Sequence, residues 1–148
     1  MKASRGIIFG ALGIYIQLAG AEVLACQVTA LPVSFGIIDP MIVQSYSSVS
    51  SVSIQNCIAA TSFSVSLSTG GSNDYTQRRM VSSDQNYLMY NLLLSEGVVW
   101  GDGSGETSTW NGTVGSAGAE HAVYGRLAHQ PNVYPGTYTD SIIVTLTF

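Results

Sequence analysis

The stretch Gly136-Thr-Tyr-Thr-Asp-Ser-Ile-Ile-Val-Thr-Leu-Thr-Phe148 is the strongest strand signal in the sequence. One side of the alternation is apolar and the other side carries threonine and serine, with Ile143 as the single apolar exception. A period of two with many β-branched residues predicts a strand that buries one face. The predicted inward residues are Tyr138, Ile142, Val144, Leu146 and Phe148.

No turn and no further strand follow Phe148 in the sequence. We therefore expect this terminal strand to keep one edge unpaired. Soluble proteins normally cover, charge or shorten such an edge, because it pairs with any extended chain that fits. The pattern predicts a domain that takes a strand from another molecule.

Other segments alternate in the same way, and Ser62–Ser68 does so without interruption, with three apolar residues between serines. A half-buried strand of an antiparallel sheet has this pattern. No helical period appears, and turn signals recur about every ten residues, which predicts one all-β antiparallel sandwich of about seven or eight strands. The other expected strands lie near residues 26–31, 33–35, 49–57, 87–94, 98–100, 107–114 and 121–127.

The beginning of the chain has the form of a secretory signal. Lys2 and Arg5 precede an apolar run at residues 6–18, and small residues at 19–21 form a cleavage pattern. We predict cleavage after Ala21, with Ala25 as the alternative, and a folded domain at 22–148. A membrane anchor is the competing interpretation, but the apolar run is shorter than the roughly 20 residues that a span needs. The mature chain is therefore expected to have no membrane span.

Cleavage would leave a distinctly acidic chain. The remaining chain has three arginines, nine acidic residues and no lysine, which gives a net charge of −6. Nucleic acid is an improbable partner, because phosphate binding needs clustered Lys and Arg. The predicted signal places the mature chain outside the cytoplasm.

Cys26 and Cys57 are the two cysteines of the sequence. In an exported protein an even count predicts one disulfide, although two free thiols remain the alternative. His121 and His129 complete no zinc-site spacing with them, so no metal is expected.

Catalytic patterns are weak. Asp102, Glu106 and Asp140 could be paired as carboxylates for glycoside hydrolysis, but nothing around them in the sequence predicts a raised pKa. The two histidines lack a nucleophile-elbow serine motif. We predict a non-enzymatic protein without a cofactor.

The aromatic residues allow two interpretations. They could form a sugar-binding surface, but such residues are more often core or cross-strand pairs. The residues concerned are Trp100, Trp110, Tyr87, Tyr90 and Tyr124.

Several short phrases, in order and spacing, resemble the spore coat U domain family, which includes the subunits of archaic chaperone–usher pili. The resemblance runs from Cys26 to Phe148. The phrases are Cys26-x-Val28, Phe35-Gly36-x-x-x-Pro40, Cys57, Arg79-Met80, Leu88-x-Tyr90-Asn91-Leu92, Trp100-Gly101-Asp102-Gly103, Tyr124-Gly125-Arg126 and Gly136-x-Tyr138-x-Asp140-x-x-x-Val144-Thr145.

The resemblance implies an immunoglobulin-like pilin fold that lacks its last strand. A periplasmic chaperone fills the gap first, an usher assembles the fibre, and the N-terminal extension of a neighbouring subunit then replaces the chaperone. Adhesion and biofilm formation are the implied functions, and the implied location is the periplasm during assembly and then the cell surface or the medium. The groove and its unpaired edge would be formed by Ile142, Val144, Leu146 and Phe148.

The sequence departs from the family pattern before the first cysteine. Only Glu22–Ala25 separates the predicted cleavage site from Cys26, and four residues span roughly 13 Å, too little to complete a neighbour's sheet. We therefore predict a subunit that accepts a strand without donating one, as a fibre tip would. The alternatives are a lone accessory subunit and a self-contained secreted carbohydrate-binding or coat domain.

Overall fold

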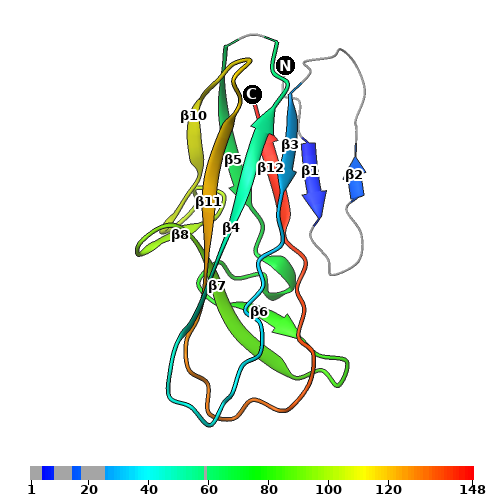
Figure 1. Cartoon of the computed structure of the whole chain (residues 1–148), viewed down its shortest axis with the longest axis vertical. Helices are drawn as coiled ribbons and strands as arrows, with labels where there is room; N and C mark the ends of the chain where they lie inside the picture. The colour runs from blue at the N-terminus through cyan, green and yellow to red at the C-terminus, as the bar shows by residue number, and fades with distance from the viewer. Residues whose placement is uncertain (1–4, 9–14, 18–25, 59) are drawn as a thin grey trace.

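The computed structural model describes residues 5–8, 15–17, 26–58 and 60–148, and these form a sandwich-like all-β fold (Figure 1). No α-helix occurs in these segments, and η1 (Gly70–Ser72) is a single 3₁₀ turn. Of the predicted signal segment, the structure describes only two short strands, at residues 5–8 and 15–17. The rest of this segment and both predicted cleavage sites lie outside the described residues.

Two sheets make up the fold. The five-stranded sheet has the order β10 (Trp110–Val114), β5 (Thr61–Leu67), β12 (Ile143–Thr147), β1 (Arg5–Ile8), β2 (Tyr15–Gln17). The curled second sheet has the order β3 (Gln27–Ala30), β4 (Tyr46–Gln55), β11 (Ala119–Leu127), β7 (Tyr87–Ser95), β8 (Val98–Trp100), β9 (Thr107–Ser108), and β6 (Arg78–Val81) also pairs with β7.

The core lies between the sheets and follows the predicted alternation. Val144 and Leu146 of β12 are fully buried, whereas Ile143 between Ile142 and Val144 is 41% exposed. In β5 the three apolar residues between the serines are likewise buried. The inward and outward faces of both strands were therefore predicted correctly.

The terminal strand is shorter than predicted, because β12 begins only at Ile143. Upstream of it, Thr139 forms an isolated bridge with Val81 of β6, in the other sheet. The Asp140 carboxylate then accepts a hydrogen bond from the Ser141 amide at 2.8 Å, which removes that amide from any ladder. Residues 136–142 thus cross from the curled sheet to the five-stranded sheet instead of extending one strand.

The prediction of an unpaired edge is wrong for the chain as described. β12 pairs with β5 on one side and with β1 on the other, where Arg5 lies opposite Leu146 and Ile8 opposite Ile143. β1 also contacts β3, the first strand after Cys26. The edge was expected to be free because residues 1–21 were assigned to a removable signal and excluded from the fold.

The sandwich is not purely antiparallel. β8 and β9 pair in parallel, with Val99 opposite Thr107 and Trp100 opposite Ser108. The glycine-rich loop between them folds back on itself, and the Thr107 amide donates to the Ser104 carbonyl at 3.1 Å. The predicted strand at residues 33–35 is also absent from the ladders, and this segment between β3 and β4 has no regular secondary structure.

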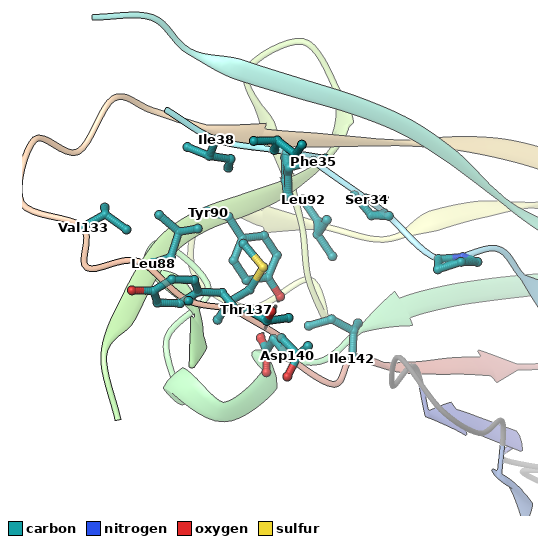
Figure 2. A pocket seen from close by; sticks show the side chains of 18 of the residues that line it. Ser34, Phe35, Ile38, Leu88, Tyr90, Leu92, Val133, Thr137, Asp140 and Ile142 are labelled. Carbon is teal, nitrogen blue, oxygen red and sulfur yellow. Dashed lines mark hydrogen bonds between the residues drawn. The ribbon is translucent and has the colours of Figure 1, made fainter. Parts of the chain in front are cut away.

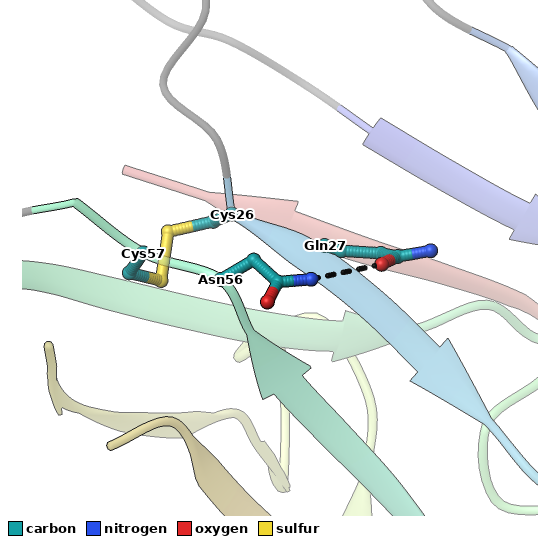
Figure 3. The surroundings of a disulfide bond; sticks show 4 residues. All are labelled: Cys26, Gln27, Asn56 and Cys57. Carbon is teal, nitrogen blue, oxygen red and sulfur yellow. Dashed lines mark hydrogen bonds between the residues drawn. A yellow bond between two sulfur atoms is a disulfide. The ribbon is translucent and has the colours of Figure 1, made fainter. Parts of the chain in front are cut away.

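The disulfide between Cys26 and Cys57 is present and joins two neighbouring strands (Figure 3). Cys26 directly precedes β3 and Cys57 follows β4, and the two strands pair with Gln27 opposite Gln55. Beside the disulfide, the side-chain amide of Asn56 donates a hydrogen bond to the side-chain carbonyl of Gln27 at 3.2 Å. The prediction of one disulfide, stapling two strands, is confirmed.

The disulfide yields a stability prediction. The bond joins residues 31 positions apart, and on the chain-entropy model its loss costs about 3–4 kcal/mol. A Cys26→Ser/Cys57→Ser double variant should lose this amount in urea unfolding. A change below about 1 kcal/mol would mean that the β3–β4 ladder holds this end of the sandwich without the bond.

Candidate functional site

An apolar groove of about 770 Å³ opens between the two sheets (Figure 2). The segment 31–38 forms one side, β7 another, and the segment 133–142 a third. Figure 2 shows Phe35 of the segment 31–38 and Tyr90 and Leu92 of β7 converging on the same space. We call this space the inter-sheet groove.

The inter-sheet groove contains only part of the predicted wall. Ile142 and Val144 line it. Leu146 is fully buried and Phe148 is partly buried against the core, and both lie further along the chain than the residues lining the groove. The groove therefore meets β12 at its beginning, whereas β1 lies along the part from Ile143 to Leu146.

Sequence reasoning did not find the opposite wall. It is made of alternate residues of β7, with Met80 of β6 and the extended segment 31–38. The inward residues Leu88, Tyr90 and Leu92 are 4%, 8% and 3% exposed. Their period of two was visible in the sequence, but nothing there told which sheet they would face.

Gly125 lets the segment 31–38 lie close to β11. A Cβ atom at this position would come within 2.7 Å of Val33 Cγ1 and 2.9 Å of Phe35 Cζ. Such distances do not occur between real Cβ atoms and their neighbours, so a side chain here would push the segment away. This glycine fixes one side of the inter-sheet groove.

Asp140 joins three elements at the edge of the groove. Its carboxylate accepts hydrogen bonds from the Tyr90 hydroxyl at 2.7 Å and from the Gly71 amide at 3.0 Å. Burial, and then the Asp140 carboxylate, raise the pKa of Tyr90 far above its ordinary value of 10.0. Asp140 thus connects the 3₁₀ turn, β7 and the approach to β12.

Arg78 is a fully buried cation that sequence reasoning did not single out. Its guanidinium donates to the Ser68 carbonyl at 3.0 and 2.8 Å, to the Trp100 carbonyl at 2.6 Å and to the Asn91 side chain at 2.7 Å. Burial lowers the pKa of Arg78. Because Ser68 and Trp100 follow β5 and end β8, this residue ties the two sheets together.

The remaining family-motif residues fall into three places. Phe35, Gly36, Gly136 and Tyr138 line the inter-sheet groove together with Asp140. Trp100 is fully buried, and its indole donates to the Val65 carbonyl at 3.0 Å, while Gly101 and Asp102 continue into the following loop. Tyr124, Gly125 and Arg126 lie on β11 and border a second, shallower depression.

Among the candidate catalytic carboxylates, Asp102 makes local hydrogen bonds, whereas Asp140 bonds the distant Gly71 and Tyr90. Asp102 accepts from the Ser104 amide at 2.9 Å, and hydrogen bonds from Ser104 lower the pKa of Asp102. His121 packs edge-on against Trp100, with ring centroids 5.4 Å apart. Within the described segments, no three His, Cys, Asp or Glu side chains gather as a metal-binding group would, and no helix is long and apolar enough to cross a membrane.

The structure separates the aromatic residues that the sequence had grouped. Trp100 and Tyr90 are core residues, and Trp110 is partly buried against Phe63 with ring centroids 4.8 Å apart. Tyr87 and Tyr124 are 49% and 41% exposed. The core interpretation therefore holds for part of the set, while two tyrosines lie at the surface.

Comparison with known proteins identifies one family model, that of the spore coat protein U domain, which matches residues 16–145. No curated protein matches the chain.

The Arg78 contacts predict a large difference between two adjacent arginines. Arg78→Ala leaves two buried carbonyls without donors and should cost about 3 kcal/mol of unfolding free energy. Arg79 stacks over the Tyr87 ring at 4.3 Å, and Arg79→Ala should cost less than about 1 kcal/mol. Urea unfolding of both variants measures the two losses. Equal losses of unfolding free energy would contradict the conclusion that the Arg78 hydrogen bonds tie the two sheets together.

The raised pKa of Tyr90 predicts a loss of stability at high pH. The folded protein holds the phenol proton to higher pH than the unfolded chain, so this contribution is complete below about pH 10 and declines above it. The pKa of Tyr75 is also raised, so its contribution to stability likewise declines at high pH.

Urea unfolding at a series of pH values between about 8 and 11 measures this effect. Tyr90→Phe should flatten the alkaline decline, whereas Tyr134→Phe, at a residue that is 66% exposed, should leave it unchanged. An identical decline in wild type and Tyr90→Phe would show that the Tyr90 phenol does not produce it.

Proposed function

Because the chain belongs to the spore coat protein U domain family, a structural family, we propose that it is an exported subunit of an archaic chaperone–usher pilus. It takes up an extended strand from a partner along β12. The partners are a periplasmic chaperone, the usher and a neighbouring pilus subunit. The immunoglobulin-like, strand-deficient form of the sandwich belongs to this proposal.

The pairing of β12 carries the proposal. Its edge toward β3 is covered by Arg5–Ile8, a segment that the sequence predicts to be removed on export. Without that segment, the backbone groups of β12 that β1 pairs would lose their partners. Buried or half-buried backbone groups need partners, so the mature domain would bind an extended chain there.

The inter-sheet groove supports the same proposal. It begins at Val144 and Ile142 and continues past Asp140 toward Tyr138, along the chain that leads into β12. A strand that paired with β12 could therefore place alternate side chains between the sheets. Apolar side chains would fit, because Met80, Leu88 and Leu92 form the opposite wall.

Export is supported by the disulfide, since such bonds persist in oxidising compartments. An adhesive role is supported by the loop between β3 and β4. Ile37, Met41 and Val43 of this loop are 96%, 86% and 83% exposed, and the loop extends to the end of the sandwich away from the C-terminus (Figure 1). Several exposed apolar side chains on one loop are typical of a contact surface.

The second candidate is a self-contained secreted domain. The same β1–β12 pairing favours it if residues 5–8 remain in the mature protein, because one chain then completes its own sheet. The two candidates differ in one property: whether residues 143–147 are protected in the isolated mature domain.

Periplasmic expression with and without the cognate chaperone tests the proposal. The processed domain should accumulate only with the chaperone. In hydrogen exchange, the β12 amides that do not pair with β5 should exchange fast in the free domain and slowly in the chaperone complex. The β5 amides, flanked by β10 and β12, provide the internal control.

Two results would overturn the proposal. One is stable monomeric accumulation of the processed domain without a chaperone. The other is slow exchange across residues 143–147 in that monomer. Together they would establish the self-contained domain, whose sheet closes within one chain.

A further inference from the structure

The outer face of the curled sheet carries a shallow depression of about 580 Å³, away from the inter-sheet groove. We call it the outer-face depression, and the residues that define it here are Ser47, Val49, Leu93, Glu96, Tyr124 and Arg126. These residues come from β4, β7, β11 and the turn after β7. The proposed strand uptake uses none of them.

The register of β11 explains why the depression forms. Val123 and Leu127 are buried in the core, so Tyr124 and Arg126, between them in the alternation, face outward. Tyr124 lies opposite Val49 on β4 and Leu93 on β7. Leu93 is only 7% exposed yet lies outside the inter-sheet core cluster, so it forms an apolar floor on the outer face.

The polar groups at its border are free to rearrange. Arg126 Nη2 and Glu96 Oε1 are 3.9 Å apart, and their side chains are 60% and 92% exposed. A pair at this distance and exposure contributes little to stability. It offers guanidinium donors and carboxylate acceptors side by side. Tyr124, which also lines the depression, is 41% exposed.

This combination fits one class of ligand. Two adjacent hydroxyls of a sugar can accept from a guanidinium and donate to a carboxylate, and the C–H face of a pyranose ring can pack on a tyrosine. An apolar floor with a few converging polar groups is typical of small-molecule sites. The sugar would lie over Leu93 and Tyr124, with its hydroxyls toward Arg126 and Glu96.

Charge argues for a neutral sugar. The sequence has a net charge of −4, and Glu96 itself borders the depression. Of the other two arginines after residue 25, Arg78 is fully buried and Arg79 stacks on Tyr87. A polyanionic chain would be repelled by this surface.

We propose that the outer-face depression binds a neutral saccharide through the Tyr124 ring, the Arg126 guanidinium and the Glu96 carboxylate. This site is separate from the edge of β12, so a subunit could hold its strand partner and a saccharide together. The proposal does not depend on the proposed pilus role.

Saturation-transfer NMR on the purified full chain tests the proposal, with methyl glycosides of glucose, galactose and mannose as probes and polygalacturonate as the charged arm. At least one neutral glycoside should receive saturation. Tyr124→Ala and Arg126→Ala should each weaken its binding about tenfold or more.

The pair Tyr87 and Arg79 provides a matched control, because it is a second exposed tyrosine beside an arginine, on β7 and β6. Tyr87→Ala and Arg79→Ala should leave the binding unchanged. Three results would overturn the site: no transfer to any neutral glycoside, binding of polygalacturonate alone, or equal losses in the test and control variants. Unchanged unfolding curves for the Tyr124 and Arg126 variants ensure that a loss reports the site and not the fold.

Discussion

Pairing of the β12 backbone on both of its edges is the constraint on which the rest of the structure depends. A strand whose inward side chains are fully buried cannot leave a row of amides and carbonyls unpaired beside them without a large cost. β5 pairs one edge over residues 144–147, and β1 pairs the other over residues 143–146. β3 and β12 lie in different sheets, and β1 contacts both. What fills that position determines whether the domain closes by itself or through a partner.

Polar side chains hold the two sheets in place around this position. Arg78 donates to carbonyls that follow β5 and end β8, and Asp140 accepts from β7 and from the 3₁₀ turn. Each replaces backbone pairing at a point where the chain passes from one sheet to the other. Asp140 and the segment 31–38 both line the inter-sheet groove, so its wall at Asp140 is set by hydrogen bonds as well as by apolar packing.

The two surfaces described here arise from the two faces of the same strands. On β11 the inward residues join the core and Gly125 admits the segment 31–38, while Tyr124 and Arg126 face solvent. On β7 the inward residues line the inter-sheet groove, while Leu93 forms the floor of the outer-face depression. One alternating pattern thus supplies an apolar interior and a mixed polar surface on the opposite side.

Local sequence pattern determined the strand type, the inward faces of β5 and β12, the disulfide and the family, because alternation, cysteine count and ordered motifs are properties of the chain itself. It did not determine which strand would lie beside β12, since pairing partners distant in sequence are chosen by closure of the whole sheet. Nor could it locate the buried Arg78 or the wall of Met80, Leu88 and Leu92, because alternation shows which residues share a face of a strand but not what that face packs against. Only the tertiary structure decided these features, since burial and hydrogen-bond partners depend on which segments meet in space.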